Sequence, residues 1–305
     1  MRRGLKLSHL RLLSALGDTG QLTQAAAAVG ISQPAASRLV AEIERITGHP
    51  VHERSGRGIE MTSIGRALAL RAQRVQIELD DAARDLAEIA GGGVGHVRIG
   101  TVTGAALDRV LPALQVERQL HPNVTIDVIV AASEMLCEQL LSGRLDFALG
   151  RIPEGTTGEG LVFSAMETEP VALIARRDHP LLGKGVQTAA AVLAHDWVMP
   201  GVESLLTRTV LARLHGLGLP APPIRLSTPS FLLTLAVLQH SDSIAVVAEA
   251  TALQFGHGTD APFGIIPVDL GIVVEPYGML SRDRMALPPA AQHLAEVIRD
   301  IDPGR

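Results

Sequence analysis

The sequence predicts an α/β protein preceded by an all-α helix-turn-helix with a wing, and three observations support this prediction. Residues 22–39 have the apolar spacing and the turn glycine of two short helices that cross. A long amphipathic stretch over residues 63–90 ends at three consecutive glycines, residues 91–93. From residue 95 onward, short apolar runs alternate with helical patterns, which is typical of a mainly parallel sheet with right-handed crossovers.

Composition and charge indicate a folded chain of several domains with nucleic acid at one end. The 305 residues are 47% hydrophobic, enough for more than one core. The net charge of −5 is uneven, because residues 1–66 carry nine Lys/Arg against five Asp/Glu and the remainder carries 18 against 27. A basic N-terminal region followed by an acidic remainder indicates that only the N-terminal region binds DNA. No aromatic residue occurs before Phe147, so this region lacks the stacking platforms that bind single strands or RNA.

The first three expected helices form the helix-turn-helix. A first helix over residues 7–17 should buttress the pair, and Gly30 supplies the residue that tolerates a positive φ at the turn. Ser32 is the expected N-cap of the next helix, and Pro34 falls in its first turn, where a missing donor costs nothing. Five positions that should pack between the helices are all apolar: Ala25, Val29, Ile31, Ala36 and Leu39.

One face of the second crossing helix is rich in hydrogen-bond donors. Ser32, Gln33, Pro34, Ser37 and Arg38 fall outside the apolar stripe, with Gln33, Ser37 and Arg38 pointing outward. Gln and Arg side chains can read base edges in the major groove, and Ser reaches bases or phosphates. The alternative is an ordinary Ala-rich helical pair with a solvated face. The agreement of packing, turn and donors favours double-stranded DNA as the partner.

A hairpin over residues 53–61 is expected to form the wing. Two glycines separate its short extended pieces, and Arg54 and Arg57 lie at its tip. These arginines either contact phosphates or the minor groove beside the recognition helix, or are solvated in a turn. The neighbouring helix favours DNA contacts.

Residues 63–90 are expected to form one linker helix that begins after an N-cap at Thr62. Its apolar register alternates steps of four and three over Leu68, Ala72, Val75, Leu79, Ala82, Leu86 and Ile89. This heptad seam predicts a dimer partner, although packing against its own domain is the alternative. Residues 91–93 would form a hinge and are not a dinucleotide loop, because no strand precedes them.

The remaining chain is predicted to contain two α/β subdomains. The expected domains are residues 1–62, 63–92 and 93–305, with a first subdomain of 93–162 plus 267–305 and a second of 163–266. The two chain crossings, at residues 152–163 and 266–268, would act as hinges. Ligands of open α/β sheets bind beyond the strand ends, where helix N-termini offer free amides. A small polar or anionic metabolite is therefore expected in the cleft.

Polar and small residues at these strand ends are the candidate effector contacts. They are Thr101, Thr103, Ser133, Met199, Pro200, Thr228 and Ser230. The alternative is that the Ser and Thr residues are only helix N-caps. Arg151 is the nearby cation, either at the cleft or on the surface.

The N-terminal motifs resemble those of LysR-type transcriptional regulators. They are Ala25-Ala26, the run from Ser32 to Ser37, and Glu44, Gly48, Arg54, Thr62 and Gly65. The resemblance covers essentially the whole chain. It implies a winged helix-turn-helix, a dimer-forming linker helix, and a two-subdomain periplasmic-binding-protein-like effector domain whose contact loops match the candidate residues. Tetramers are common in the family. His52 departs from the pattern, since it replaces a usually buried aromatic.

Within the family, the first 90 residues look most like regulators of sugar-binding-protein and aromatic-acid genes. The predicted function is therefore a cytoplasmic, effector-modulated DNA-binding regulator that forms dimers.

Other classes of protein fit the sequence less well. No G-x-S-x-G, phosphate loop or H-E-x-x-H indicates an enzyme, and no cofactor is expected. Cys137 is a lone, buried structural thiol by expectation, and the histidines show no metal-ligand spacing, so no metal is expected. A transport-type binding module would need an export signal, whereas the first residues look like an amphipathic helix. A purely architectural DNA binder would not need the second domain. No run reaches transmembrane length.

Overall fold

Two units make up the structure, which is a computed structural model. It describes residues 4–55, 58–90, 95–156, 158–256, 258 and 261–302, without the side chains of residues 54, 55, 58, 59, 84, 85 and 87–90. The chain divides into Met1–Val94 and Gly95–Arg305, and each unit is described by itself.

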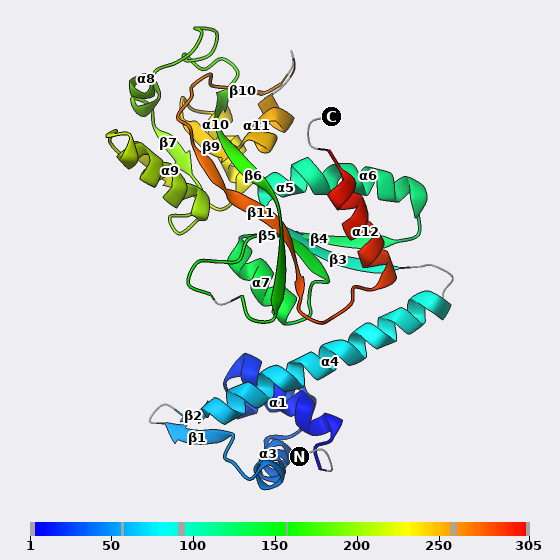
Figure 1. The fold of residues 1–305 in the computed structure, drawn as a ribbon. Helices are drawn as coiled ribbons and strands as arrows, with labels where there is room; N and C mark the ends of the chain where they lie inside the picture. Colours follow the sequence, from blue (N-terminus) through cyan, green and yellow to red (C-terminus); the bar gives the residue numbers. More distant parts are fainter. Residues whose placement is uncertain are drawn as a thin grey trace. The chain divides into compact units, whose positions relative to one another are not determined.

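The N-terminal unit is a winged helix-turn-helix followed by a long helix, as predicted (Figure 1). Its elements in order are α1 (Leu7–Thr19), α2 (Leu22–Ala28), α3 (Gln33–Thr47), β1 (His52–Ser55), β2 (Gly58–Met61) and α4 (Ser63–Ala90). Gly30 takes a φ of 71° at the turn between α2 and α3. The expected packing positions are buried or partly buried around Leu12, Leu13 and Leu16 of α1.

Two glycines allow close approaches in this unit. A Cβ on Gly65 would lie 2.0 Å from the Val51 carbonyl oxygen, and one on Gly17 would lie 2.9 Å from the Ala69 Cβ. Thr62 caps α4 by accepting a hydrogen bond from the Gly65 amide at 3.0 Å. The first turn of α4 is thus fixed against the chain that leads into the hairpin.

The seam of α4 is divided between two environments. Leu68 and Ala72 pack into the core of the helix-turn-helix, so the alternative of packing within the domain holds for this end. From Val75 onward the seam faces outward, with exposed fractions of 42% for Val75, 48% for Leu79 and 68% for Leu86. No described residue of the same unit covers these side chains, so this half of the seam is free to meet a partner.

The C-terminal unit consists of two lobes. Lobe A contains β3 (His96–Thr101), β4 (Thr125–Val130), β5 (Phe147–Gly150), and the helices α5 (Thr103–Ala105), η1 (Ala106–Val110), α6 (Leu111–Leu120), α7 (Ser133–Leu141) and α12 (Pro289–Asp300). Lobe B contains β7 (Trp197–Met199), β8 (Ile224–Ser227), β9 (Ile244–Ala248), β10 (Phe263–Ile265), and the helices α8 (Ala189–Leu193), α9 (Leu205–Gly216), α10 (Phe231–Gln239) and α11 (Glu249–Gly256). Strands β6 (Leu161–Arg176) and β11 (Val273–Arg282) run through both lobes (Figure 1).

Each lobe is a sheet with a hydrophobic core on both faces. In lobe A, one core packs α6 and α12 against the sheet and the other packs α7. In lobe B, α8 and α9 cover one face, and α10 and α11 cover the other. Parallel strands with helices on both faces are the expected α/β architecture.

The two long strands correct the predicted connection between the lobes. The strand order is β4-β3-β5-β11-β6-β9-β7-β8, with β10 also paired to β6. β6 and β11 are antiparallel, so the sheet is mixed, whereas β3 pairs with β4 and β5, and β7 with β8 and β9, in parallel. The chain crosses between the lobes near residues 168–170 and 274–277, where the register of β11 shifts.

These crossings differ from the predicted ones at residues 152–163 and 266–268. Residues 266–272 belong to lobe B, because Ile266, Leu270 and Ile272 are buried in its core. The apolar spacing predicts only residues 170–176 of β6 as a strand, because residues 162–165 are exposed and show no clear alternation of burial. It predicts neither of the short helices α8 and α11.

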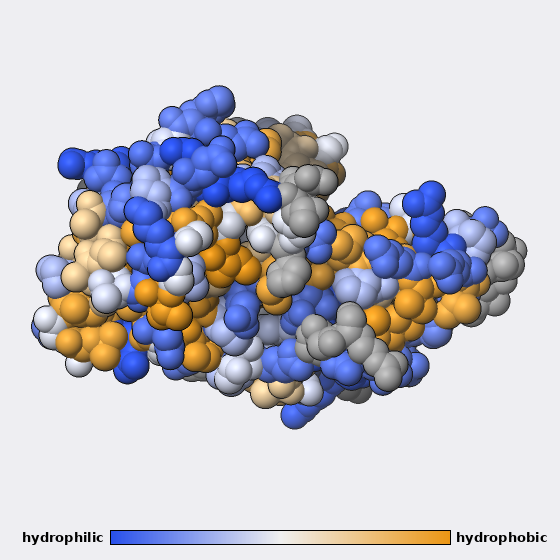
Figure 2. Space-filling view, turned by 90° about the horizontal axis from the view of Figure 1, so that it is seen from above, coloured by the Kyte–Doolittle hydropathy of each residue, from blue (hydrophilic) through white to orange (hydrophobic). Residues whose placement is uncertain are grey.

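The surface in Figure 2 alternates hydrophobic patches with hydrophilic residues. Among the described helices, none combines the length and the apolar composition needed to cross a membrane.

Candidate functional site

The outer face of α3 presents the five predicted side chains. Ser32, Gln33, Pro34, Ser37 and Arg38 are all exposed, whereas Ala36, Val40 and Ile43 on the opposite face are buried. The Ser32 hydroxyl caps the helix by accepting from the Ala35 amide at 3.4 Å. Arg38 Nε donates to the Pro34 carbonyl at 3.4 Å, which leaves the rest of its guanidinium facing outward.

The wing adjoins this helix, and Glu44 connects the two. Glu44 Oε1 accepts from the Val51 amide at 2.9 Å and lies 2.9 Å from His52 Nδ1. His52 therefore fills the position of the expected aromatic with a polar contact to α3. Arg54 lies in β1 opposite Ile59, but its side chain, like all of Arg57, lies outside the described residues.

A buried imidazole, that of His9, helps to fix α3 to α1. His9 is fully buried, its Nδ1 accepts from the Lys6 amide at 3.0 Å, and its Nε2 lies 3.3 Å from Glu42 of α3. The neighbouring His9 imidazole lowers the pKa of the Glu42 carboxyl. Glu42 therefore stays ionised at neutral pH and faces away from the donor-rich side of α3.

A cavity of about 1290 Å³ lies between lobes A and B. Lobe A contributes residues after β3, β4 and β5, and lobe B contributes the starts of α9, α10 and α11 and part of β9. Most of the lining side chains are apolar, including Leu107, Ile129, Phe231 and Phe255. This position beyond strand ends is where α/β proteins bind ligands.

The structure brings together four of the seven predicted cleft residues. Thr103, Ser133, Pro200 and Thr228 line the cavity. Thr101 and Met199 are buried inside their strands, with exposed fractions of 0% and 1%, and do not line it. Ser230 is also absent from the lining, because its hydroxyl caps α10 by accepting from the Leu233 amide. Successive residues of a strand point to opposite faces, and at the end of β3 it is Val102, not Thr101, that lines the cavity.

Arg151 is a buried cavity residue rather than a surface cation. Its Nη2 lies 2.8 Å from Glu169 Oε2, and its Nε donates to the Glu275 carbonyl at 2.8 Å. The two side chains are only 10% and 15% exposed. Since Glu169 lies in β6 and Glu275 in β11, Arg151 connects the end of β5 to both crossing strands.

Gly104 is needed beside this ion pair. A Cβ at Gly104 would lie 2.0 Å from Glu169 Oε1, so any larger residue would displace the carboxylate. A second ion pair joins Arg109 Nη2 to Glu167 Oε1 at 2.6 Å. Glu167 lies in β6, two residues before Glu169. Both crossing strands are thus held to lobe A by buried guanidinium groups.

Two lining threonines have hydroxyls without a hydrogen-bond partner among the described residues. Thr103 is exposed, so its hydroxyl is a candidate contact for a bound molecule. The Thr251 hydroxyl on α11 is buried and has no accessible surface, so it is not a direct contact.

The rim of the cavity is acidic. Glu134, Glu154, Glu203 and Glu275 line it, are exposed, and have no cationic partner among the described residues. Of the two arginines in the lining, Arg151 pairs with Glu169, whereas Arg208 is exposed and donates to the Glu203 carbonyl through Nη1 at 2.6 Å.

Family models match both units of the chain. Residues 7–66 match the bacterial regulatory helix-turn-helix protein, lysR family, and residues 90–302 match the LysR substrate binding domain. The regulator GbpR of Rhizobium radiobacter is 37% identical over 259 residues, which cover 84% of this chain and 85% of that protein. The chain belongs to the LysR family of transcriptional regulators.

Further relatives match nearly the whole length of this LysR-type regulator. GbpR of Azospirillum brasilense is 34% identical over 300 residues, covering 97% of this chain and 86% of that one. Among solved structures, a full-length OxyR variant from Pseudomonas aeruginosa has a TM-score of 0.66 at 18% identity, covering 98% and 96%. Full-length CbnR in complex with its target DNA has a TM-score of 0.62 at 21% identity, covering 97% and 99%. At these identities the structures show a shared fold.

The single cysteine of this LysR-type regulator is not an activated thiol. Cys137 is buried on α7, and its Sγ contacts the Arg151 carbonyl at 3.5 Å. Burial, together with the negative charges of Glu134 and Glu138, raises the pKa of the Cys137 thiol to about 11. The thiolate, which is the reactive form, is therefore scarce at neutral pH.

The sequence did not reveal the acidic partner of Arg151. Glu169 follows Arg151 by 18 residues and lies in a strand whose first half was not predicted. One feature of the sequence could have indicated this partner. The run from Met166 to Val171 places ionisable residues between apolar ends of a strand.

Proposed function

We propose that this LysR-type regulator reads promoter DNA with the outer face of α3 and responds to a small neutral polar metabolite bound between lobes A and B. It would act in the cytoplasm, where bacterial promoter DNA lies. The single observation that carries the effector proposal is the cavity at the strand ends, whose lining includes the exposed Thr103 with a hydroxyl that has no partner among the described residues.

Electrostatics favour a neutral ligand over an anion. Helix N-termini of α7, α9 and α10 adjoin the cavity, and each carries roughly half a positive charge. Four rim carboxylates carry full negative charges against two arginines, of which Arg151 is paired with Glu169 and only Arg208 has no carboxylate partner among the described residues. Amides and hydroxyls remain to bind hydroxyl or carbonyl groups, while the apolar walls bind the carbon skeleton. This narrows the sequence-based expectation of a polar or anionic metabolite.

The position of Arg151 supports a route from ligand to domain geometry. Its guanidinium contacts β6 and β11 where they cross between the lobes, and Ser133, a lining residue, accepts from the Arg151 amide at 3.1 Å. A ligand that prefers one arrangement of the two lobes would shift their relative populations. The relatives named above are transcriptional regulators, which supports a regulatory rather than an enzymatic response.

A matched ligand screen tests the effector class. Neutral sugars or amides are compared with the corresponding carboxylic acids by thermal shift, with Trp197 fluorescence as a second readout. A ligand at 100 times its dissociation constant stabilises the protein by about 2.7 kcal/mol. We expect hits among the neutral members, and Thr103→Val with Ser133→Ala should weaken them at least tenfold. Thr101→Val is the matched control, because this threonine does not line the cavity. Hits confined to the acids would contradict the proposal.

Base reading by α3 has a separate test. Gln33→Ala and Arg38→Ala should each lower the ratio of operator affinity to random-DNA affinity, since a bidentate base contact contributes about 1–3 kcal/mol of discrimination. Arg54→Ala should instead weaken binding to all sequences alike, as expected of a phosphate contact. Fluorescence anisotropy at fixed salt measures both affinities. An unchanged ratio for Gln33→Ala would exclude this residue as a base reader.

A further inference from the structure

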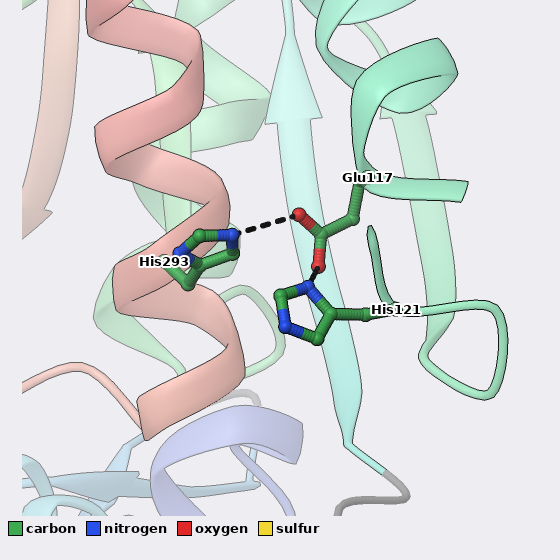
Figure 3. A group of neighbouring side chains, drawn as sticks. All are labelled: Glu117, His121 and His293. Atoms are coloured by element: carbon green, nitrogen blue, oxygen red, sulfur yellow. Dashed lines mark ion pairs between the residues drawn. The ribbon is translucent and has the colours of Figure 1, made fainter. Parts of the chain in front are cut away.

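A cluster of three potential metal ligands lies in lobe A, away from the cavity. Glu117 of α6, His121 at the C-terminal end of that helix and His293 of α12 converge, with their ligand atoms all within 4.8 Å of one another (Figure 3). None of the three lines the cavity. The sequence contains one indication, since Glu117 and His121 are four residues apart, but His293 is brought to them only by the packing of α12 on α6.

The carboxylate of Glu117 is the unusual member of the cluster. Its side chain is 2% exposed, and it lies at the edge of the apolar core that includes Ala113 and Leu294. Oε2 is buried without a hydrogen-bond partner among the described residues, and so is His293 Nε2. Burying a carboxylate is costly unless a cation or hydrogen bonds compensate for the lost hydration.

The distance between Glu117 and His293 fits two ligands of one metal ion better than it fits a hydrogen-bonded ion pair. Glu117 Oε2 and His293 Nε2 are 3.4 Å apart and do not form a hydrogen bond. Zinc ligands at roughly 2.1 Å in a tetrahedron are separated by about 3.4 Å. On the other side, His121 Nδ1 lies 2.9 Å from Glu117 Oε1, so a small rotation of the His121 ring is needed to admit an ion.

We propose that Glu117, His121 and His293 form a binding site for a divalent transition-metal ion of the zinc class. Two imidazole nitrogens and one carboxylate oxygen are a recognised zinc ligand set, which leaves the fourth position to water. The imidazoles are 47% and 39% exposed, so an ion and its water can reach the site from solvent. The buried carboxylate supplies the negative charge that favours a cation over neutral water.

The consequence lies in how α12 is held. Glu117 and His121 belong to one segment and His293 to another, 172 residues later, so an ion would fasten the C-terminal helix to α6. Figure 3 shows the two helices presenting these side chains to each other. Since both helices cover one core of lobe A, metal binding should stabilise that lobe.

The test measures metal binding by the full-length protein after treatment with a chelator. Equilibrium dialysis with Zn²⁺ should give one ion per chain, and Co²⁺ should give the visible absorption of a tetrahedral site. His293→Gln and His121→Gln should each weaken binding at least about tenfold and abolish the rise in Tm that Zn²⁺ causes. The control is His96→Gln, because His96 Nε2 also lies 2.9 Å from a carboxylate, that of Asp127, but lacks a second imidazole.

The outcomes separate the proposal from its alternatives. One equivalent of Zn²⁺, retained in His96→Gln and lost in both cluster variants, supports it. Absence of binding at roughly 100 µM free Zn²⁺, or binding that survives either cluster substitution, overturns it, and the three residues are then an ordinary ion pair. Circular dichroism checks that each variant is folded.

Discussion

Replacing Arg151 by alanine is expected to lower the free energy of unfolding of the C-terminal unit by about 3–5 kcal/mol, the cost of breaking a buried ion pair from one side. The substitution leaves Glu169 only 15% exposed without its guanidinium partner and removes the donor to the Glu275 carbonyl. Guanidinium chloride unfolding followed by fluorescence measures the loss. Trp197 is the only tryptophan and is buried in lobe B, so the signal reports on this unit.

Two further variants determine whether the effect comes from the uncompensated charge. Arg176→Ala is the matched control, because its partner Asp242 is 55% exposed and such pairs contribute about 1 kcal/mol or less. The double variant Arg151→Met with Glu169→Met should recover much of the loss, since it removes both charges and keeps the volume. Equal losses for Arg151→Ala and Arg176→Ala would refute the account of the buried pair.

Replacing Leu79 by aspartate is expected to dissociate the dimer. Leu79 is 48% exposed in the single chain and lies in the outward-facing half of the α4 seam, between Val75 and Leu86. By two-fold symmetry the substitution acts twice, and burying each leucine contributes roughly 1.5 kcal/mol or more. The loss of about 3 kcal/mol weakens association more than a hundredfold, before the cost of burying a carboxylate is added. Sedimentation velocity over a range of concentrations measures it.

Leu70→Asp provides the control for this prediction. Leu70 is 61% exposed on the same helix but lies off the seam, so its substitution should leave the oligomer unchanged. Loss of the dimer should also weaken binding to a DNA site with two half-sites, because each head would then bind alone. An intact oligomer in Leu79→Asp would exclude the seam as the dimer contact.

Local spacing was enough to predict the helix-turn-helix. The turn at Gly30, the cap at Ser32 and the apolar positions from Ala25 to Leu39 depend on residues within a few turns of one another, and the structure has all of them. The same holds for α4, whose ends agree with the amphipathic pattern. Its environment did not follow from the pattern, because Ala72 and Leu79 share one register but only Ala72 is covered by its own domain.

The cavity shows where local pattern stops being informative. The position at a strand end is enough to predict that Thr103 and Ser133 line the cavity. It does not exclude Thr101, because the direction of each side chain depends on the local backbone and on which lobe faces it.

The helix-turn-helix with its linker helix, the basic charge of the N-terminal region, and the family to which the chain belongs all follow from the amino-acid sequence alone. Only the tertiary structure shows which distant residues are in contact, such as Arg151 with Glu169 and Glu117 with His293. The physical reason is that helix and strand patterns arise from neighbours along the chain. Ion pairs and ligand clusters instead depend on the register of long-range strands and on helix packing, and no local spacing encodes these.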